Sequence, residues 1–254
     1  MANPWPFLDH PGPIPFAHRG GAGEWPENTM PAFESAVALG YRYVETDVHV
    51  TADGILLAFH DDHLDRVTNR TGVIAELPWR EVRLARVDGR EPIPLLEDLL
   101  GTWPDLRVNI DPKHDGAIAS LVDVLRRTGS AERVCLGAFS DRRLAVLRRT
   151  LGPDVCMSLG PRATARLRAA SFGLPVGRVR GACAQVPRAF RGIRVTDRRF
   201  VDEAHRRGLQ VHVWTIDGAE EMNQLLDVGV DGIMTDRPAV LRQVLERRGQ
   251  WTGD

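Results

Sequence analysis

The chain has 254 residues, of which 43% are hydrophobic and 26% charged, and its formal net charge is -1. These values are ordinary for a globular protein, and they exclude the strongly basic composition with which nucleic-acid-binding proteins attract phosphate backbones. No apolar run approaches the roughly 20 residues of a membrane-spanning helix. Residues 1–6 lack the basic start and apolar core of an export signal, so we expect a cytoplasmic protein.

Along the chain, short β-branched runs alternate with helical patterns, which predicts parallel strands joined by helices. The expected strands are residues 14–18, 43–49, 106–111, 134–138, 155–158, 182–186, 209–214 and 231–235. This number of strands and a length of about 250 residues are typical of a (β/α)8 TIM barrel. We therefore expect one barrel domain spanning residues 1–254.

Turn and capping residues mark the ends of the first and last helices. Asn28 is expected to cap the first helix, with Pro31 in its opening turn and Gly40 just beyond its end. Pro238 is expected to open the last helix, which would bury Leu241 and neighbouring aliphatic residues.

One connection is much longer than the about two to six residues usual between a strand and a helix of such a barrel. It spans residues 51–104, between the second and third barrel strands, and contains a short apolar run, residues 55–59, before His60. We interpret it as a small insertion over the barrel mouth that shapes a substrate pocket, with a returning helix at residues 95–100. The alternative is a structural embellishment with no role at the site.

Three carboxylates stand at or near the ends of predicted strands. Glu45 and Asp47 are two residues apart, so they project from the same face of an extended strand, and Asp111 ends another strand. Carboxylates that are forced together repel each other unless a cation lies between them. Oxygen ligands suit Mg²⁺ or Ca²⁺, so we expect one divalent cation here. The alternative is that each acid pairs with a surface arginine.

Lys113 is the only lysine in a chain whose lysines and arginines together number 33. An ammonium group is a compact, rotatable point charge, whereas a guanidinium group is a planar fork. We therefore interpret Lys113 as a functional cation. The alternative is the chance survival of one surface lysine.

Several short motifs follow one another along the chain. They are His18-Arg19-Gly20, Pro26-Glu27-Asn28-Thr29, Glu45-Thr46-Asp47, Thr51-Ala52-Asp53-Gly54, His60-Asp61, Asp111-Pro112-Lys113, Val213-Trp214-Thr215 and Thr235-Asp236. In this order they resemble the glycerophosphodiester phosphodiesterase family. The resemblance covers nearly the whole chain and is most specific between His18 and Asp61.

The resemblance implies a barrel that hydrolyses a glycerophosphodiester to an alcohol and glycerol 3-phosphate with the help of a divalent cation. Carried over position by position, it implies an acid/base pair, two phosphate contacts and three metal ligands. These are, in that order, His18 and His60, Arg19 and Lys113, and Glu45, Asp47 and Asp111.

One position departs from the family pattern. Asp111 stands where the family usually has glutamate, so its shorter side chain must either draw the backbone closer to the metal or bind through water. Pro112 follows it, and because proline cannot donate to a parallel ladder, we expect the strand to stop at Asp111.

The same residues suit phosphodiester hydrolysis on chemical grounds. A catalyst must neutralise the charge of the diester, activate an attacking oxygen and protonate a poor alkoxide leaving group. Imidazoles serve the last two tasks near neutral pH, although the sequence does not say which histidine is the base. Trp214 is expected to offer a ring face to the glycerol moiety, and a buried barrel side chain is the alternative.

Residues 155–196 contain eight arginines and no acid. Most such stretches are solvated helix faces, as we expect for Arg162, Arg166 and Arg168. The alternative, with Phe172 nearby, is a basic surface in weak contact with anionic lipid headgroups at a membrane, which would add lysophospholipids to the substrates.

The three cysteines, Cys135, Cys156 and Cys183, have no short paired spacing. We therefore interpret them as small buried hydrophobic side chains rather than as disulfides or metal ligands.

Three functions follow from these patterns. The favoured one is a metal-dependent phosphodiesterase of small-molecule glycerophosphodiesters. A second keeps the barrel and its histidines but is a lysophospholipase D or a sphingomyelinase-D-like phosphotransferase, which releases a cyclic phosphate. A third is a catalytically silent barrel that binds a phosphorylated ligand or partner. The leaving alcohol, the choice between Mg²⁺ and Ca²⁺ and the oligomeric state stay open.

Overall fold

Eight parallel strands form one closed sheet in this structure, a computed structural model that describes residues 5–253. The strands are β1 (Ile14–His18), β2 (Tyr43–Val50), β6 (Arg107–Pro112), β7 (Val134–Leu136), β8 (Cys156–Met157), β9 (Cys183–Pro187), β12 (Gln210–Trp214) and β13 (Gly232–Thr235). Their order is β8-β7-β6-β2-β1-β13-β12-β9, and a parallel bridge between Ser158 and Cys183 joins the two ends. The expected (β/α)8 TIM barrel is confirmed.

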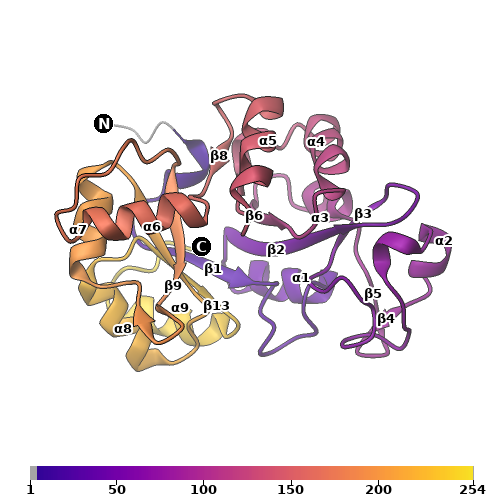
Figure 1. Cartoon of the computed structure of the whole chain (residues 1–254). Coiled ribbons are helices and arrows are strands. Elements are labelled where there is room, and N and C mark those ends of the chain that lie inside the picture. The colour runs from indigo at the N-terminus through magenta and orange to yellow at the C-terminus, as the bar shows by residue number, and fades with distance from the viewer. Residues whose placement is uncertain (1–4, 254) are drawn as a thin grey trace.

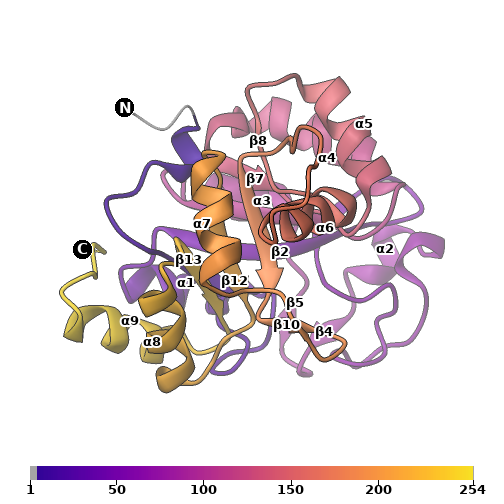
Figure 2. The same ribbon diagram turned by 60° about the vertical axis from the view of Figure 1, so that its left-hand side comes forward.

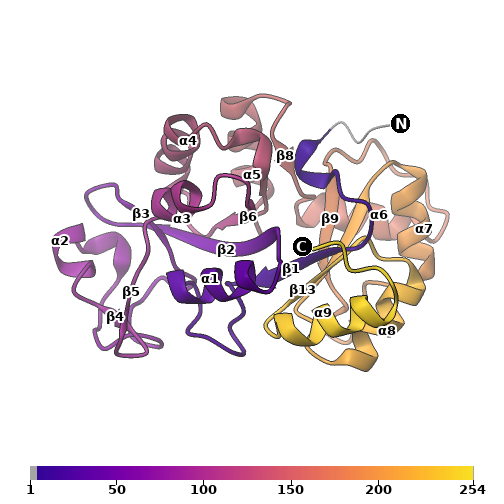
Figure 3. The same cartoon turned by 180° about the vertical axis from the view of Figure 1, so that it is seen from behind.

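A helix follows each barrel strand on the outside of the sheet (Figures 1 and 3). These helices are α1 (Met30–Ala38), α3 (Leu96–Thr102), α4 (Ala117–Thr128), α5 (Asp141–Leu151), α6 (Pro161–Ala170), α7 (Arg198–Arg206), α8 (Ala219–Val228) and α9 (Pro238–Arg247). As predicted, Pro31 lies in the first turn of α1, Pro238 opens α9, and Leu241 is buried.

The first helix begins one residue later than its predicted cap implies. Thr29, not Asn28, is the N-cap of α1, and its hydroxyl accepts a hydrogen bond from the Ala32 backbone N–H at 3.4 Å. Asn28 has a φ of 54°, and its buried side chain contacts Thr46 and Asp47. The predicted Asn28 cap is wrong because this amide bonds to side chains of β2 instead of to the helix.

Strand β6 runs one residue further than predicted. Pro112 pairs with Val48, and the Lys113 backbone N–H donates to the Val48 carbonyl at 3.1 Å. On its other side, β6 pairs with β7 only as far as Ile110, opposite Leu136. The backbone N–H groups of alternate residues in a parallel strand point toward opposite neighbouring strands. Because the Lys113 N–H points toward β2, the proline nitrogen at position 112 faces the β7 side, where pairing has already ended. The expectation that the strand stops at Asp111 is therefore wrong.

The insertion between β2 and α3 forms a lobe at one side of the barrel (Figure 1). It contains β3 (Leu56–Ala58), the 3-10 helix η2 (Ile74–Glu76), α2 (Trp79–Val82), β4 (Arg86–Val87) and β5 (Glu91–Pro92). β3 pairs antiparallel with β2, and an apolar cluster that includes Phe59 and Leu64 fills the lobe. The predicted returning helix at residues 95–100 corresponds to α3.

The remaining short elements are the 3-10 helices η1 (Pro6–Leu8) and η3 (Ala131–Arg133) and a hairpin of β10 (Ala189–Phe190) and β11 (Ile193–Arg194). The hairpin directly follows β9 (Figure 2). Two large apolar clusters, which contain Phe33 and Phe200, include residues of both strands and outer helices. A third cluster, with Phe16 and Tyr43, is formed largely by strand residues.

No helix among residues 5–253 is long and apolar enough to cross a membrane. Residues 1–4, which belong to the segment judged to lack an export signal, lie outside the described residues. The cytoplasmic location stays a prediction.

Candidate active site

Polar side chains from three adjacent strands lie close together at the strands' carboxyl ends. His18 of β1 is in register with Glu45 of β2, and Asp47 of β2 is in register with Asp111 of β6. Residues two apart on a strand share one face. This register therefore places the histidine and the three buried acids at one edge of the barrel mouth.

His18 lies between two carboxylates. Its Nδ1 is 2.6 Å from Oδ1 of Asp236, the residue just after β13, and its Nε2 is 3.7 Å from Oε2 of Glu45. Burial favours the neutral imidazole, but the charges of Glu45 and Asp236 outweigh burial and raise the pKa of His18. His18 therefore holds a proton at neutral pH more readily than a free histidine does.

His60, which belongs to the insertion, is likewise held by an aspartate. Its Nδ1 is 2.6 Å from Oδ1 of Asp61, and its backbone carbonyl lies 2.9 Å from Nε2 of His49. Each predicted catalytic histidine is thus oriented through Nδ1 by an aspartate, which leaves Nε2 as the nitrogen available for proton transfer.

Lys113 lies between two of the acids. Its Nζ is 2.6 Å from Oδ1 of Asp47 and 2.9 Å from Oδ2 of Asp111. Burial alone would raise the pKa of Asp47, but the charges of Lys113, Arg19 and His60 outweigh burial and lower that pKa. The single lysine of the chain therefore places its compact charge between two buried carboxylates.

At Glu45 and Asp111, in contrast to Asp47, burial outweighs the nearby positive charges. Burial, together with the nearby Asp47, raises the pKa of Glu45 to about 7. Burial also raises the pKa of Asp111, despite its contact with Lys113. Oδ1 of Asp111 is buried and has no hydrogen-bond partner, an arrangement that a further cation would stabilise.

Arg19 connects these acids to the loop after β1. With a φ of 51°, it donates its backbone N–H to Oε2 of Glu45 at 3.1 Å. Its guanidinium Nε lies 3.2 Å from Oδ2 of Asp47, and its NH1 donates to Glu27 at 3.1 Å.

A second arginine extends this network into the insertion. Arg66 donates to both oxygens of Glu27, at 2.7 and 2.9 Å, and to Oδ2 of Asp61 at 2.5 Å. Since Asp61 orients His60, Arg66 connects that histidine to the barrel mouth.

Trp214 lies beside an aromatic residue that the sequence did not single out. Its ring meets Phe139 edge to face, with the centroids 5.5 Å apart. Nζ of Lys113 lies 5.9 Å from the Phe139 centroid, and Phe139 is 66% exposed. The two rings thus provide apolar surface next to Lys113.

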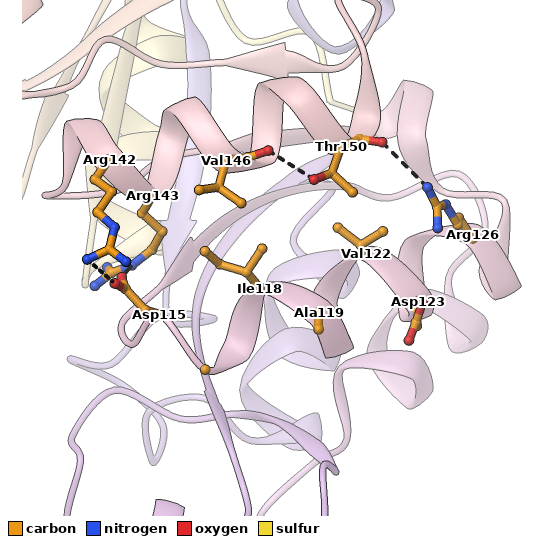
Figure 4. A pocket seen from close by; sticks show the side chains of 11 residues that line it. Asp115, Ile118, Ala119, Val122, Asp123, Arg126, Arg142, Arg143, Val146 and Thr150 are labelled. Carbon is orange, nitrogen blue, oxygen red and sulfur yellow. Dashed lines mark hydrogen bonds and ion pairs between the residues drawn. The ribbon is translucent and has the colours of Figure 1, made fainter.

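The hollow in Figure 4 is separate from this site. It lies between α4 and α5, has a volume of about 570 Å³ and is lined by side chains that include Ile118 and Val146. Asp115 accepts from Arg143 at 3.0 Å at one end of the hollow. None of the candidate site residues lines it.

The arginine-rich stretch is only partly a solvated face. Arg162 and Arg166 are exposed, as predicted. Arg168 instead makes two hydrogen bonds of 2.8 Å to the carboxylate of Asp197, so its expected solvation is wrong. The acid that pairs with Arg168 lies just beyond the stretch in sequence.

Comparison with known proteins assigns this chain to a family. Residues 18–240 match the model of the glycerophosphoryl diester phosphodiesterase family. A Mycobacterium tuberculosis protein named "Probable glycerophosphodiester phosphodiesterase 2" is 42% identical, over 97% of this chain and 96% of its own. The chain belongs to this family. The expected family and enzyme class are confirmed.

Other named proteins and solved structures are also similar to this chain. A lysophospholipase D of Homo sapiens is 25% identical, over 90% of this chain and 85% of its own. A solved Oleispira antarctica phosphodiesterase in complex with the product sn-glycerol-3-phosphate has a TM-score of 0.78 and 24% identity, over 92% of this chain and 97% of its own. A Silicibacter pomeroyi structure from the same family reaches a TM-score of 0.81 at 25% identity, over 98% of this chain and all of its own.

Glycerophosphoryl diester phosphodiesterases generally use a divalent metal ion. The three carboxylates, with the unpartnered oxygen of Asp111, fit a hard cation chemically. They do not form a closed cage. Among residues 5–253, the one group of three potential ligands whose ligand atoms all lie within 4.8 Å of one another consists of cysteines.

Several residues that orient the predicted ones were not themselves predicted from the sequence. Asp236, Glu27 and Asn28 all stand in motifs that carried the family resemblance, so a signal for them was present. Arg66 and Phe139 had no such signal, because only the folded chain places them beside the site.

Proposed function

We propose that this glycerophosphoryl diester phosphodiesterase family member hydrolyses small-molecule glycerophosphodiesters to an alcohol and glycerol 3-phosphate by histidine acid/base catalysis. The observation that supports this most strongly is the matched pair of histidines. His18 and His60 each have Nδ1 2.6 Å from an aspartate oxygen, and buried acids and cations lie close to both. One imidazole would remove a proton from the attacking oxygen while the other protonates the leaving alkoxide.

The cationic side chains would bind the phosphate. Arg19 lies against Asp47 of β2, and Lys113 lies against Asp47 and Asp111, so both cations are close to the proposed catalytic groups. Their charges would be most stabilising as negative charge builds up on the phosphate oxygens. The rings of Trp214 and Phe139 would contact the glycerol moiety beside Lys113.

We further propose that Glu45, Asp47 and Asp111 hold one divalent cation, Mg²⁺ or Ca²⁺. Such a cation draws negative charge from phosphate oxygens and makes a bound water more acidic. Binding would require Lys113 to release one of its two carboxylates and turn toward substrate. The insertion, residues 51–104, would close one side of the pocket and hold His60.

The test is an assay of chelator-stripped protein on glycerophosphocholine and glycerophosphoethanolamine, with Mg²⁺, Ca²⁺ or Mn²⁺ added back. We expect metal-restored release of glycerol 3-phosphate from wild type and its loss in His18→Ala. His63→Ala removes an exposed histidine of the insertion and should retain the activity. Tight binding of glycerol 3-phosphate without turnover under every metal would instead support a silent binding barrel.

A second candidate is lysophospholipase D activity, which would use the same histidines on a lipid substrate. Phe190 and Ile193, in the hairpin after β9, are 58% and 67% exposed. Together with the human relative named for this activity, they support an acyl chain lying along the hairpin. The double variant Phe190→Ser, Ile193→Ser should then lower turnover of lysophosphatidylcholine but not of glycerophosphocholine. Analysis of the product would separate hydrolysis from release of a cyclic phosphate.

A further inference from the structure

The three cysteines come from three neighbouring strands of the barrel. Cys135 lies on β7, Cys156 on β8 and Cys183 on β9. Their Sγ atoms all lie within 4.8 Å of one another, and all three residues are buried. The prediction that they are buried is confirmed, but their wide spacing in sequence gave no sign that their sulfurs meet.

The sulfur geometry suits a tetrahedral metal centre. Sγ of Cys135 and Sγ of Cys183 are 3.8 Å apart. Zinc–thiolate bonds of about 2.3 Å in a tetrahedral centre place the sulfurs about 3.8 Å apart. Two thiols in van der Waals contact lie at a similar distance, so this distance alone does not indicate a metal site. The third sulfur, within 4.8 Å of both, is what distinguishes a metal site from a contact between two thiols.

A histidine lies next to the cluster. His212 of β12 is buried and is in register with Gln185 of β9, so its side chain lies on the same face of the sheet as that of Cys183, two residues before Gln185. Its Nε2 is 3.1 Å from Oε1 of Gln210, whereas the nearest partner of Nδ1, the Gln185 amide, is 3.5 Å away. When Nε2 donates to Gln210, Nδ1 carries the lone pair, and a metal there would replace only the long contact with the Gln185 amide.

We infer that Cys135, Cys156 and Cys183, with His212 as fourth ligand, form a buried structural site for a thiophilic cation, Zn²⁺. Three thiolates and one imidazole are a ligand set of structural zinc sites, and thiolates disfavour Mg²⁺ and Ca²⁺. This site is independent of the proposed activity.

The location of the cluster suggests what the metal would do. β8 has two residues, and β8 joins β9 through the single bridge between Ser158 and Cys183. Cys156 lies on the β8 side of this junction and Cys183 on the β9 side. A metal bound to both cysteines would therefore hold the barrel closed where two neighbouring strands share the fewest backbone pairs. Because the site is buried, the metal would bind as the chain folds.

The first experiment measures metal retention in wild type. Protein purified under reducing conditions should retain about one Zn²⁺ per chain after treatment of the folded protein with a chelator, because a closed structural site is inaccessible. Protein unfolded in chelator and refolded with Cd²⁺ should show thiolate-to-cadmium absorbance in the near ultraviolet. Zn²⁺ should also raise the melting temperature of the refolded protein by several degrees.

The second experiment uses single variants. Cys135→Ala, Cys156→Ala and Cys183→Ala should each lose roughly a third of the Cd²⁺ absorbance, since each removes one of three sulfur ligands. His212→Gln should keep that absorbance but release metal to chelator faster. Ser158→Ala is the matched control at the junction of β8 and β9 and should behave as wild type. Glu45→Gln, at the proposed active site, should retain the zinc.

Two outcomes would overturn the inference. Refolded wild type that shows no Cd²⁺ absorbance and exposes three reduced thiols on unfolding would mean that the cysteines only fill the barrel. Recovery of a Cys135–Cys183 disulfide, with one free thiol, from protein kept under reductant would also contradict it.

Discussion

At the scale of single residues, the site depends on side chains that orient other side chains. Asp236 is the clearest case, because its Oδ1 lies 2.6 Å from Nδ1 of His18, whereas the other ring nitrogen of His18 faces Glu45. A carboxylate in this position fixes the imidazole's orientation and the position of its proton.

Asp236→Asn is expected to reduce kcat by on the order of 100-fold with little change in KM, because substrate contacts are retained while the histidine loses its orientation. Asp236 also helps to raise the pKa of His18, so the limb of the pH profile that reports His18 should move to lower pH. Asp227→Asn, which removes an exposed partner of Arg248, is the control. An unchanged pH profile with a raised KM would contradict this role.

Glu45 couples the site to stability. Burial and Asp47 raise its pKa to about 7, above the ordinary value of 4.5, so the folded state binds this proton more tightly than the unfolded state does. Metal-free protein should therefore lose stability as pH rises from about 4.5 to about 7, by up to about 3 kcal/mol.

Urea unfolding in the presence of chelator, at pH 5 and at pH 7.5, would measure this effect. Glu45→Gln should flatten the dependence, whereas Glu97→Gln, an exposed partner of Arg127, should not. Added Mg²⁺ or Ca²⁺ should restore wild-type stability at the higher pH if the acids bind the cation. Equal pH slopes in wild type and Glu45→Gln would contradict the assignment.

At the scale of elements, the insertion acts through one ion-pair network. Arg66 connects Asp61, which orients His60, to Glu27 in the loop after β1. The insertion has its own apolar cluster, so we expect it to keep its fold without Arg66.

Arg66→Met is expected to lower kcat/KM by roughly tenfold while changing the free energy of unfolding by less than about 1 kcal/mol, because the side chain is half exposed. Hydrogen exchange should increase around residues 60–66 and stay unchanged in β6. Arg80→Met, in α2 of the same lobe, is the control. A loss of stability of several kcal/mol with unchanged kinetics would show a purely structural role.

At the scale of the whole molecule, closure of the sheet should make the barrel unfold as one unit. Phe33 lies in the large apolar cluster of one half of the barrel and Phe200 in that of the other, and both are fully buried. The two halves meet where β1 of one half pairs with β13 of the other over four residues.

Phe33→Ala and Phe200→Ala should each reduce the free energy of unfolding by about 3–5 kcal/mol and move one cooperative transition. Denaturant unfolding followed by both tryptophan fluorescence and circular dichroism would measure this. Two separated transitions, with only one affected by each variant, would mean that the half-barrels unfold independently.

Local patterns in the sequence were sufficient to predict the barrel and to single out candidate side chains, whose proposed roles came from the family resemblance. Strand and helix periodicity depends on neighbours in the chain, and the acids and histidines stand at strand ends within short motifs. The wrong predictions at Asn28 and Pro112 had tertiary causes. Asn28 has the chemistry of a helix cap but bonds to side chains of β2, and Pro112 is tolerated because β7 no longer pairs with β6 at that position.

Only the tertiary structure decided which of these residues meet. The Asp236–His18 contact joins the end of β13 to the end of β1, and Arg66 reaches Glu27 across 39 positions. The cysteine cluster joins β7, β8 and β9, whose cysteines are far apart in sequence. These contacts depend on strand order and register in a closed sheet, which arise from packing of the whole chain and which no sequence window contains.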